Sequence, residues 1–135
     1  MEKDCIVYID KQLLEEILES GRRLYPRESF LLLRGKKSKN TFIITDLLIP
    51  PLAVHGHSFT VAPLHMLPTD FSIIGTSHSH PSGNITPSAQ DLNHFFGRIL
   101  LIVGFPFSDQ NIGIYDRNGE KLELQLTENK KDDYE

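Results

Sequence analysis

A strand, a loop and a helix that follow one another in the second half of the chain constrain the fold most strongly. Residues 71–80 predict a strand that ends at His80, and Ser82-Gly83-Asn84 predicts a loop. Thr86-Pro87 then predicts a helix start, with Thr86 as the cap and Pro87 in the first helical position, and this helix is expected to run to about Phe96. A strand at 99–103 follows, so this half of the chain needs a sheet with a helix packed on it.

Helical spacing and strand alternation predict the remaining elements. Asp10 can cap a helix that begins at Lys11 and ends between Gly21 and Pro26. Strands are expected at 5–9, 29–33, 41–48, 112–115 and 122–126, a short strand at 58–61, one helical turn at 63–67, a polar turn at 36–40 and a hairpin turn at 117–120. The order predicts an α/β fold with a mixed sheet and helices packed on it. We expect one domain over residues 1–127 and a loose charged tail over 128–135.

Composition excludes several classes of protein. The 135 residues, 39% of them hydrophobic, suit one folded domain that needs no disulfides. Cys5 is the sole cysteine, so neither an intramolecular disulfide nor a cysteine-rich zinc site is expected. The net charge of −4 does not favour nucleic acid as a partner. There is no apolar run of about 18 residues to cross a membrane and no signal-peptide pattern, so we expect a cytoplasmic protein.

The strand before the loop carries two histidines in alternate positions. Side chains alternate along a strand, so His78 and His80 project from the same face, with α-carbons roughly 6.5–7 Å apart. Ser88 and Asp91 are three residues apart at the helix start and share a face as well. If the loop folds the helix back over the strand end, Asp91 becomes the third ligand of a metal ion. Two histidines and a carboxylate leave the fourth position of a tetrahedral zinc ion open to water, which is the pattern of catalytic zinc sites.

A catalytic zinc site also needs a general base that accepts a proton from water. The strongest candidate is Glu28, which stands beside the apolar run 30–33. A carboxylate at the end of a buried strand lowers the stability of the fold unless a partner compensates its charge, so its presence there suggests a function. Each feature alone has a plainer interpretation, because many paired histidines bind no metal, many such helix starts are only caps and most acids lie on the surface. The prediction rests on their occurrence together in one chain.

The combination resembles the JAMM or MPN+ metalloprotease family. The motif of this family is an upstream glutamate, then His-x-His, seven residues, Ser, two residues and Asp. Here Glu28 stands upstream, seven residues separate His80 from Ser88, and two separate Ser88 from Asp91. Similarity to the small archaeal single-domain members, which are desampylase-like isopeptidases, extends to three further places: 66–76, Phe105-Pro106 and 117–120.

The resemblance implies a cytidine-deaminase-like α/β fold and a zinc-dependent isopeptidase. Its substrates would be conjugates of ubiquitin-like modifier proteins, cleaved after the C-terminal di-glycine that is joined to a lysine of another protein. By transfer, His78, His80 and Asp91 bind one Zn²⁺. Glu28 takes the proton of the water and passes it to the leaving amine, and Ser88 donates a hydrogen bond to the oxyanion.

A di-glycine tail offers main chain but no side chains to a binding site. An exposed strand edge is therefore the natural way to hold it. We expect the irregular stretch 55–61 to supply this edge, with Ser58, Phe59, Thr60 and Val61 as the pairing residues.

The chain departs from the family pattern in its short loops, and two alternative functions remain open. Larger members carry a long insertion with a second, structural zinc site, which is expected to be absent because residues 107–112 are a short segment and Cys5 stands alone. The other His-x-His pair, His55 and His57, has no acid at ligand spacing and is expected in a solvated loop. The same metal could instead release the C-terminal tail of a sulfur-carrier protein. A non-catalytic MPN scaffold is the third interpretation, but scaffolds typically lack ligands that this chain retains.

Overall fold

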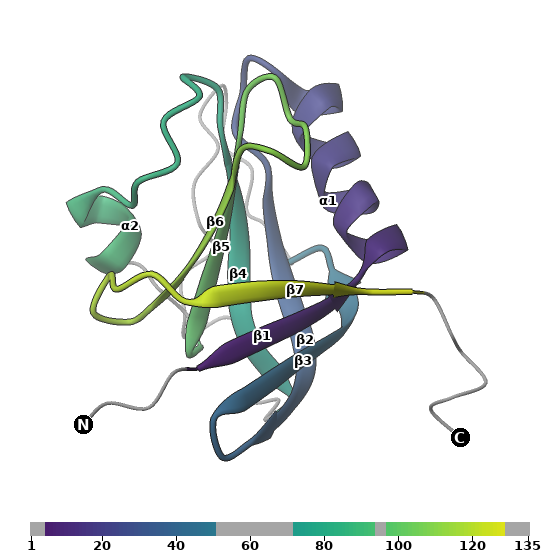
Figure 1. The fold of residues 1–135 in the computed structure, drawn as a ribbon. Helices are drawn as coiled ribbons and strands as arrows, with labels where there is room; N and C mark the ends of the chain where they lie inside the picture. The colour runs from purple at the N-terminus through teal and green to yellow at the C-terminus, as the bar shows by residue number, and fades with distance from the viewer. Residues whose placement is uncertain (1–4, 51–71, 94–96, 129–135) are drawn as a thin grey trace.

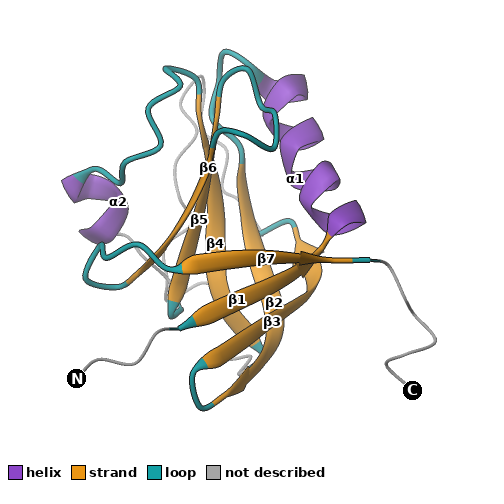
Figure 2. Ribbon diagram, in the orientation of Figure 1, coloured by secondary structure: helices purple, strands orange, loops and turns teal. Residues whose placement is uncertain are grey.

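The computed structural model describes residues 5–50, 72–93 and 97–128. The described residues form seven strands and two helices, shown by type in Figure 2. In chain order they are β1 (Ile6–Asp10), α1 (Lys11–Leu24), β2 (Phe30–Ser38), β3 (Thr41–Leu48), β4 (Ile73–His80), α2 (Ala89–Asn93), β5 (Ile99–Gly104), β6 (Ile112–Asp116) and β7 (Glu123–Thr127). Within these described ranges, no helix is both long and apolar enough to span a membrane.

All of these strands belong to one mixed sheet in the order β6-β5-β4-β2-β3-β1-β7. The pairs β4–β5, β1–β3 and β1–β7 are parallel, whereas β2–β3, β2–β4 and β5–β6 are antiparallel. The sheet curls strongly, so that its edge strands β6 and β7 approach each other (Figure 1), and a bridge between Tyr115 and Lys121 joins the end of β6 to the approach to β7. This near-barrel α/β architecture confirms the predicted fold class.

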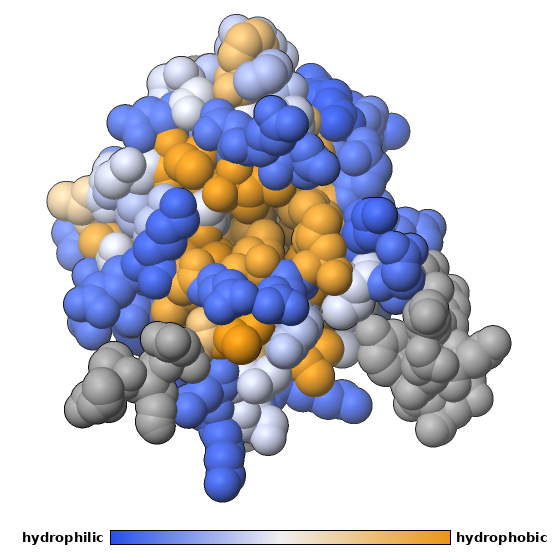
Figure 3. Space-filling model, viewed as in Figure 1, coloured by the Kyte–Doolittle hydropathy of each residue, from blue (hydrophilic) through white to orange (hydrophobic). Residues whose placement is uncertain are grey.

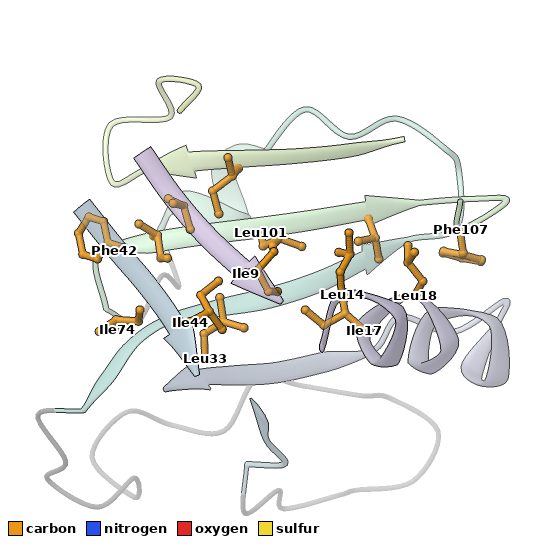
Figure 4. Close-up of a cluster of buried hydrophobic side chains, with 14 residues drawn as sticks. Ile9, Leu14, Ile17, Leu18, Leu33, Phe42, Ile44, Ile74, Leu101 and Phe107 are labelled. Carbon is orange, nitrogen blue, oxygen red and sulfur yellow. The ribbon is translucent and has the colours of Figure 1, made fainter. Parts of the chain in front are cut away.

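Helix α1 covers the concave face of the sheet and forms most of the core with it (Figure 4). Its buried residues Leu14, Ile17 and Leu18 recur at helical spacing, and they lie in one cluster with Leu101 and Phe107. Full burial of each such side chain contributes about 1.5–3 kcal/mol. The Asp10 side chain accepts a hydrogen bond from the Gln12 backbone N–H at 2.8 Å, which confirms the predicted cap of this helix.

The short helix α2 lies on the opposite face of β5. Leu92 of α2 and Ile85 of the preceding loop pack against a second cluster of Leu100, Ile102 and Tyr115. Because side chains alternate along β5, Leu101 faces α1 while Leu100 and Ile102 face α2. The central sheet is therefore buried on both sides, which explains the continuous burial of β5.

The space between the two edge strands is not closed by a further strand among the described residues. Figure 3 shows hydrophobic residues at the floor of a hollow in the middle of this face, with hydrophilic residues around it. In Figure 1 this region lies between α1 and β6, beside β7. The curled sheet therefore leaves part of its apolar interior open on this side.

The predicted end of the second strand was wrong. The Arg34-Gly35 pair was expected to stop a strand at 29–33, but β2 continues to Ser38 with a register shift at Arg34/Gly35. A Cβ at Gly35 would lie 2.0 Å from the carbonyl oxygen of Ile43, so glycine allows the strand to pass this close contact and continue. The polar turn shortens to Lys39-Asn40, where Lys39 has a φ of 49°.

The predicted hairpin turn between the last two strands is present, but the strands pair with each other only next to the turn. Residues 116–120 do form a tight turn, in which the Gly119 N–H donates to the carbonyl of Asp116. The Tyr115–Lys121 bridge closes this turn, and beyond it the strands diverge, since β6 pairs with β5 and β7 pairs in parallel with β1. β7 therefore pairs with β1 at the edge of the sheet opposite to β6.

Several predictions lie outside the described residues. They are the strand at 58–61, the helical turn at 63–67, the start of the metal-bearing strand at Phe71, the helix end near Phe96, the His55/His57 pair and the tail beyond Glu128.

Candidate metal centre

Strand β4 places the two histidines on the face of the sheet that α2 covers. His78 is paired with Ile102 and His80 with Gly104, and directly paired residues point to the same side of a sheet. The ring of His78 also meets Phe30 of β2 edge to face, with ring centroids 5.0 Å apart. This contact explains why His78 is buried at 6% exposure, and it holds the imidazole in one orientation.

Helix α2 brings Asp91 to the same place through its own capping. The Ser88 backbone N–H donates to Asp91 Oδ2 at 2.9 Å, and the Asp91 N–H donates to Ser88 Oγ at 3.0 Å. The first helical hydrogen bond runs from Leu92 to the carbonyl of Ser88, so Ser88 is the cap residue. The predicted cap at Thr86 was wrong, because only Ser88 has an acid three residues later to complete this reciprocal pair.

The loop between β4 and α2 is tied to β5 and β6 by side chains from distant parts of the chain. Asn111 donates through Nδ2 to the carbonyls of Gly83 and Phe105, at 2.9 and 3.1 Å. The Tyr115 hydroxyl donates to the carbonyl of Ile85 at 2.8 Å. These bonds fold the loop back over the strand end, which is the condition for Asp91 to reach the histidines.

The three candidate ligands meet at the carboxylate of Asp91. His80 Nε2 lies 3.1 Å from Asp91 Oδ2, and His78 Nδ1 lies 3.7 Å from Asp91 Oδ1. Two ligand atoms of a tetrahedral zinc with bonds of about 2.0–2.1 Å stand roughly 3.3–3.4 Å apart. In the described part of the chain no three such side chains are already arranged as a metal-binding group, and His80 and Asp91 bond directly to each other.

The chemistry of these donors nevertheless fits zinc. His80 Nδ1 lies 2.7 Å from the carbonyl oxygen of Asn84, so its N–H is directed there and Nε2 is the nitrogen turned toward Asp91. A cation between His80 Nε2 and Asp91 Oδ2 would take the place of a proton and needs only small shifts of the two side chains. The carboxylate already accepts the Ser88 N–H, which orients it.

Burial and mutual contacts shift the pKa values of all three groups. Burial lowers the pKa of His78 to about 4, so this imidazole is neutral at physiological pH. The hydrogen bond to Asp91 raises the pKa of His80 above its usual value, against the effect of burial. Burial alone would raise the pKa of Asp91, but hydrogen bonds from His80 and Ser88 and the nearby imidazoles lower it to about 2. Asp91 is therefore ionised and ready to hold a cation.

Glu28 stands at the mouth of the same site, just before β2. Its side chain is reached by solvent, yet burial raises the pKa of its carboxyl group, while the charge of His80 lowers it and that of Asp91 raises it. Its position is fixed by its neighbour Ser29, whose N–H donates to Ser79 Oγ at 2.7 Å and whose carbonyl accepts the Ser79 N–H at 3.2 Å. A carboxyl group with a raised pKa beside His80 and Asp91 is a candidate proton acceptor.

The structure thus brings five predicted residues into one region: Glu28, His78, His80, Ser88 and Asp91. Their roles stay predictions, and the proposed tail-binding residues Ser58, Phe59, Thr60 and Val61 lie outside the described residues.

Sequence reasoning missed the residues that hold this site in shape. Asn84 was assigned only to a loop, and Asn111 and Tyr115 lie more than twenty residues from the loop that they bind. The different orientation of Ser79 could have been recognised from the sequence. A small polar residue between two strand histidines must face the side of the sheet opposite to them.

Comparisons with known proteins agree with this geometry. A sequence profile of prokaryotic homologs of the JAB domain matches residues 10–115. A probable metalloprotease from Haloferax volcanii is 31% identical over 128 residues, which are 90% of this chain and 80% of that protein. A JAB1/MPN domain protein from Archaeoglobus fulgidus superposes with a TM-score of 0.67 at 31% identity, covering 90% of this chain and 99% of its own. A structure described as a JAMM metalloprotease-like zinc site in the proteasome and signalosome gives a TM-score of 0.65 at 29% identity, covering 93% and 100%.

Proposed function

The chain belongs to the family of prokaryotic JAB-domain proteins, and from this premise we propose that it is a zinc-dependent isopeptidase. The observation that carries the proposal is the meeting of His78, His80 and Asp91 on one face of β4. Glu28 lies close enough for its charge to interact with His80 and Asp91. This combination of two imidazoles, a carboxylate ligand and a second acid is what metal-assisted hydrolysis requires.

Two of the three ligands already have the protonation state that zinc binding needs. His78 is neutral and Asp91 is ionised near pH 7, and His80 has to release one proton. A zinc ion held by these side chains supplies Lewis-acid chemistry, which polarises a carbonyl group and makes water acidic near neutral pH.

Glu28 and Ser88 carry out the proton transfer and the charge stabilisation in this proposal. The Glu28 carboxylate accepts a proton from the attacking water and passes it to the nitrogen of the leaving amine. Ser88 Oγ accepts the Asp91 N–H in the helix cap, so its own hydroxyl proton is still available. That proton is donated to the oxyanion that develops on the scissile carbonyl.

The proposed substrates are conjugates of small ubiquitin-like modifiers, cleaved after their C-terminal di-glycine. Glycine residues suit this site because they allow a scissile carbonyl to approach a metal ion at the end of a strand without a side chain in the way. The stretch 58–61 remains the proposed strand edge for the tail. The support for this substrate class is the resemblance of the motif from Glu28 to Asp91.

The test is cleavage of a defined conjugate by the zinc-loaded protein. A ubiquitin-like protein joined through its di-glycine to a lysine is compared with the same protein carrying a linear C-terminal extension, and mass spectrometry identifies the broken bond. We expect cleavage after the second glycine of the lysine-linked conjugate, its loss with a chelator, and its loss in Glu28→Gln. Zinc-loaded protein that cleaves neither substrate would refute the proposal, and cleavage of the linear extension alone would assign the protein to tail processing.

A further inference from the structure

A second cleft, of about 850 Å³, opens at the end of the sheet that lies away from the metal centre. The register of β4 and β5 fixes this separation, since Gly75 pairs with Ile99 at one end and His80 with Gly104 at the other. Five residues of a strand span about 17 Å. Around this far end lie the start of β1, the β2–β3 turn and the loop between β6 and β7 (Figure 1). The metal centre contributes no residue to the cleft.

Positive side chains from separate segments of the chain line this cleft. They are Lys37, Lys39, Arg98, Arg117 and Lys121, against three carboxylates from Asp116, Glu120 and Glu123. The cleft therefore has an excess of positive charge, although the whole chain has a net charge of −4. Such a local reversal of sign attracts small anions.

The carboxylates of the cleft are largely occupied by neutral donors. Asp116 accepts the N–H groups of Asn118 and Glu120 at 2.8 and 3.0 Å, which builds the turn after β6. Glu123 accepts the side-chain amide of Gln125 at 2.6 Å. Within the described ranges, no ion pair involves Arg98 or Lys121. Their charges are therefore not neutralised by a direct partner there.

Cys5 also lines this cleft, together with charged side chains from separate segments of the chain. Burial raises the pKa of the Cys5 thiol, and so does the charge of Asp116, while the charges of Lys37 and Arg98 lower it. Lys37 comes from β2 and Arg98 from the residue just before β5, so two distant segments of the chain bring positive charge to this cleft. The backbone of Arg98 is fixed by its N–H, which donates to the carbonyl of Ile74 at 2.7 Å.

We propose that this cleft binds a small anion that carries phosphoryl groups. Its volume falls within the range of about 300–1,000 Å³ that is typical of small-molecule sites. Arginine and lysine are the usual partners of phosphate oxygens, arginine through two parallel hydrogen bonds and lysine as a point charge. Remaining carboxylates such as Glu120 suit the hydroxyl or amine groups of a phosphorylated metabolite. This site is separate from the proposed hydrolysis and does not depend on it.

The test uses inorganic pyrophosphate as the probe and Cys5 as a built-in reporter. Calorimetry at fixed ionic strength measures binding, and the rate of Cys5 alkylation by neutral iodoacetamide measures access to the cleft. We expect saturable binding of one pyrophosphate per chain and slower alkylation in its presence. Arg98→Gln and Lys121→Gln should each weaken binding by about tenfold or more, because each removes a charged partner. Both side chains are exposed, so these variants should remain folded.

Two control variants locate the bound pyrophosphate within the protein. Arg23→Gln makes the same charge change on the exposed side of α1 and should leave binding unaltered. Asp91→Asn disrupts the metal centre and should also leave it unaltered, because the proposed anion does not bind to zinc. The proposal is overturned if no saturable binding occurs, if Asp91→Asn abolishes binding while Arg98→Gln preserves it, or if Arg23→Gln weakens it as much as Arg98→Gln.

Discussion

Ser88 carries two tasks that substitution can separate. Its Oγ caps α2 by accepting the Asp91 N–H at 3.0 Å, and its hydroxyl proton is proposed to stabilise the oxyanion. Ser88→Ala removes both the cap and the hydroxyl. Ser88→Gly removes the hydroxyl as well, but glycine is well tolerated at the cap position of a helix. The pair of variants therefore distinguishes a catalytic loss from a structural one.

The expected magnitudes differ for the two measurements. Ser88→Ala should lower the free energy of unfolding by about 1 kcal/mol, whereas Ser88→Gly should lower it by only a few tenths. For a chain of this size, 1 kcal/mol corresponds to a fall in Tm of roughly 3–5 °C. Both variants should lose about 100- to 1,000-fold in kcat, because each lacks the oxyanion donor. Zinc should stay bound, since Asp91 still accepts the backbone N–H of residue 88, which neither change removes.

Thermal melts, zinc analysis and steady-state kinetics on a lysine-linked conjugate are run side by side on the two variants. Substrate affinity should change little, because the hydrogen bond forms mainly in the transition state. A Ser88→Gly protein with a nearly normal kcat would show that Ser88 is only a cap. A Ser88→Gly protein that loses zinc would show that the hydroxyl acts by holding Asp91 in place.

Three further predictions concern the base, the pH dependence and the sheet. Glu28→Gln should keep zinc bound and lower turnover by about 100- to 10,000-fold, and a normal rate would exclude Glu28 as the base. Zinc affinity should be measured by competition between about pH 5 and pH 8. Below the raised pKa of His80 it should fall roughly tenfold per pH unit, because this imidazole must lose one proton to bind zinc. His78, with a pKa of about 4, is already neutral in this range and adds no second proton. A two-proton slope in that range would contradict this assignment. Gly75→Ala should destabilise the protein by about 3 kcal/mol in urea unfolding, because its Cβ would lie 2.1 Å from the carbonyl oxygen of Ile99, and an unchanged midpoint would refute the β4–β5 contact.

The metal centre could be predicted from the sequence only where local periodicity decides the geometry. Alternation along β4 places His78 and His80 on one face, and helical spacing places Ser88 near Asp91. The approach of Asp91 to the histidines depends on Asn111 and Tyr115, which bind the loop from β6 and from the residue just before it. No local pattern reveals such long-range hydrogen bonds.

The errors in the fold have the same origin. The Arg34-Gly35 pair is typical of a strand end. Gly35 instead lies where two strand backbones come too close for a side chain, so β2 continues through it. The turn at 116–120 is correct as a local structure, yet the partner of β7 is β1, the first strand of the chain. Thr86 and Ser88 are both acceptable caps, and the choice of Ser88 follows from its reciprocal bonds with Asp91.

Zinc content and hydrolysis, measured together on the same sample, test whether this protein is a zinc-dependent hydrolase. The protein is prepared with zinc, stripped with a chelator and reloaded, beside the Glu28→Gln variant as a matched control. We expect one zinc per chain in both proteins, and turnover of the lysine-linked conjugate only in zinc-loaded protein that carries Glu28. Metal-free protein that retains full turnover would contradict this expectation.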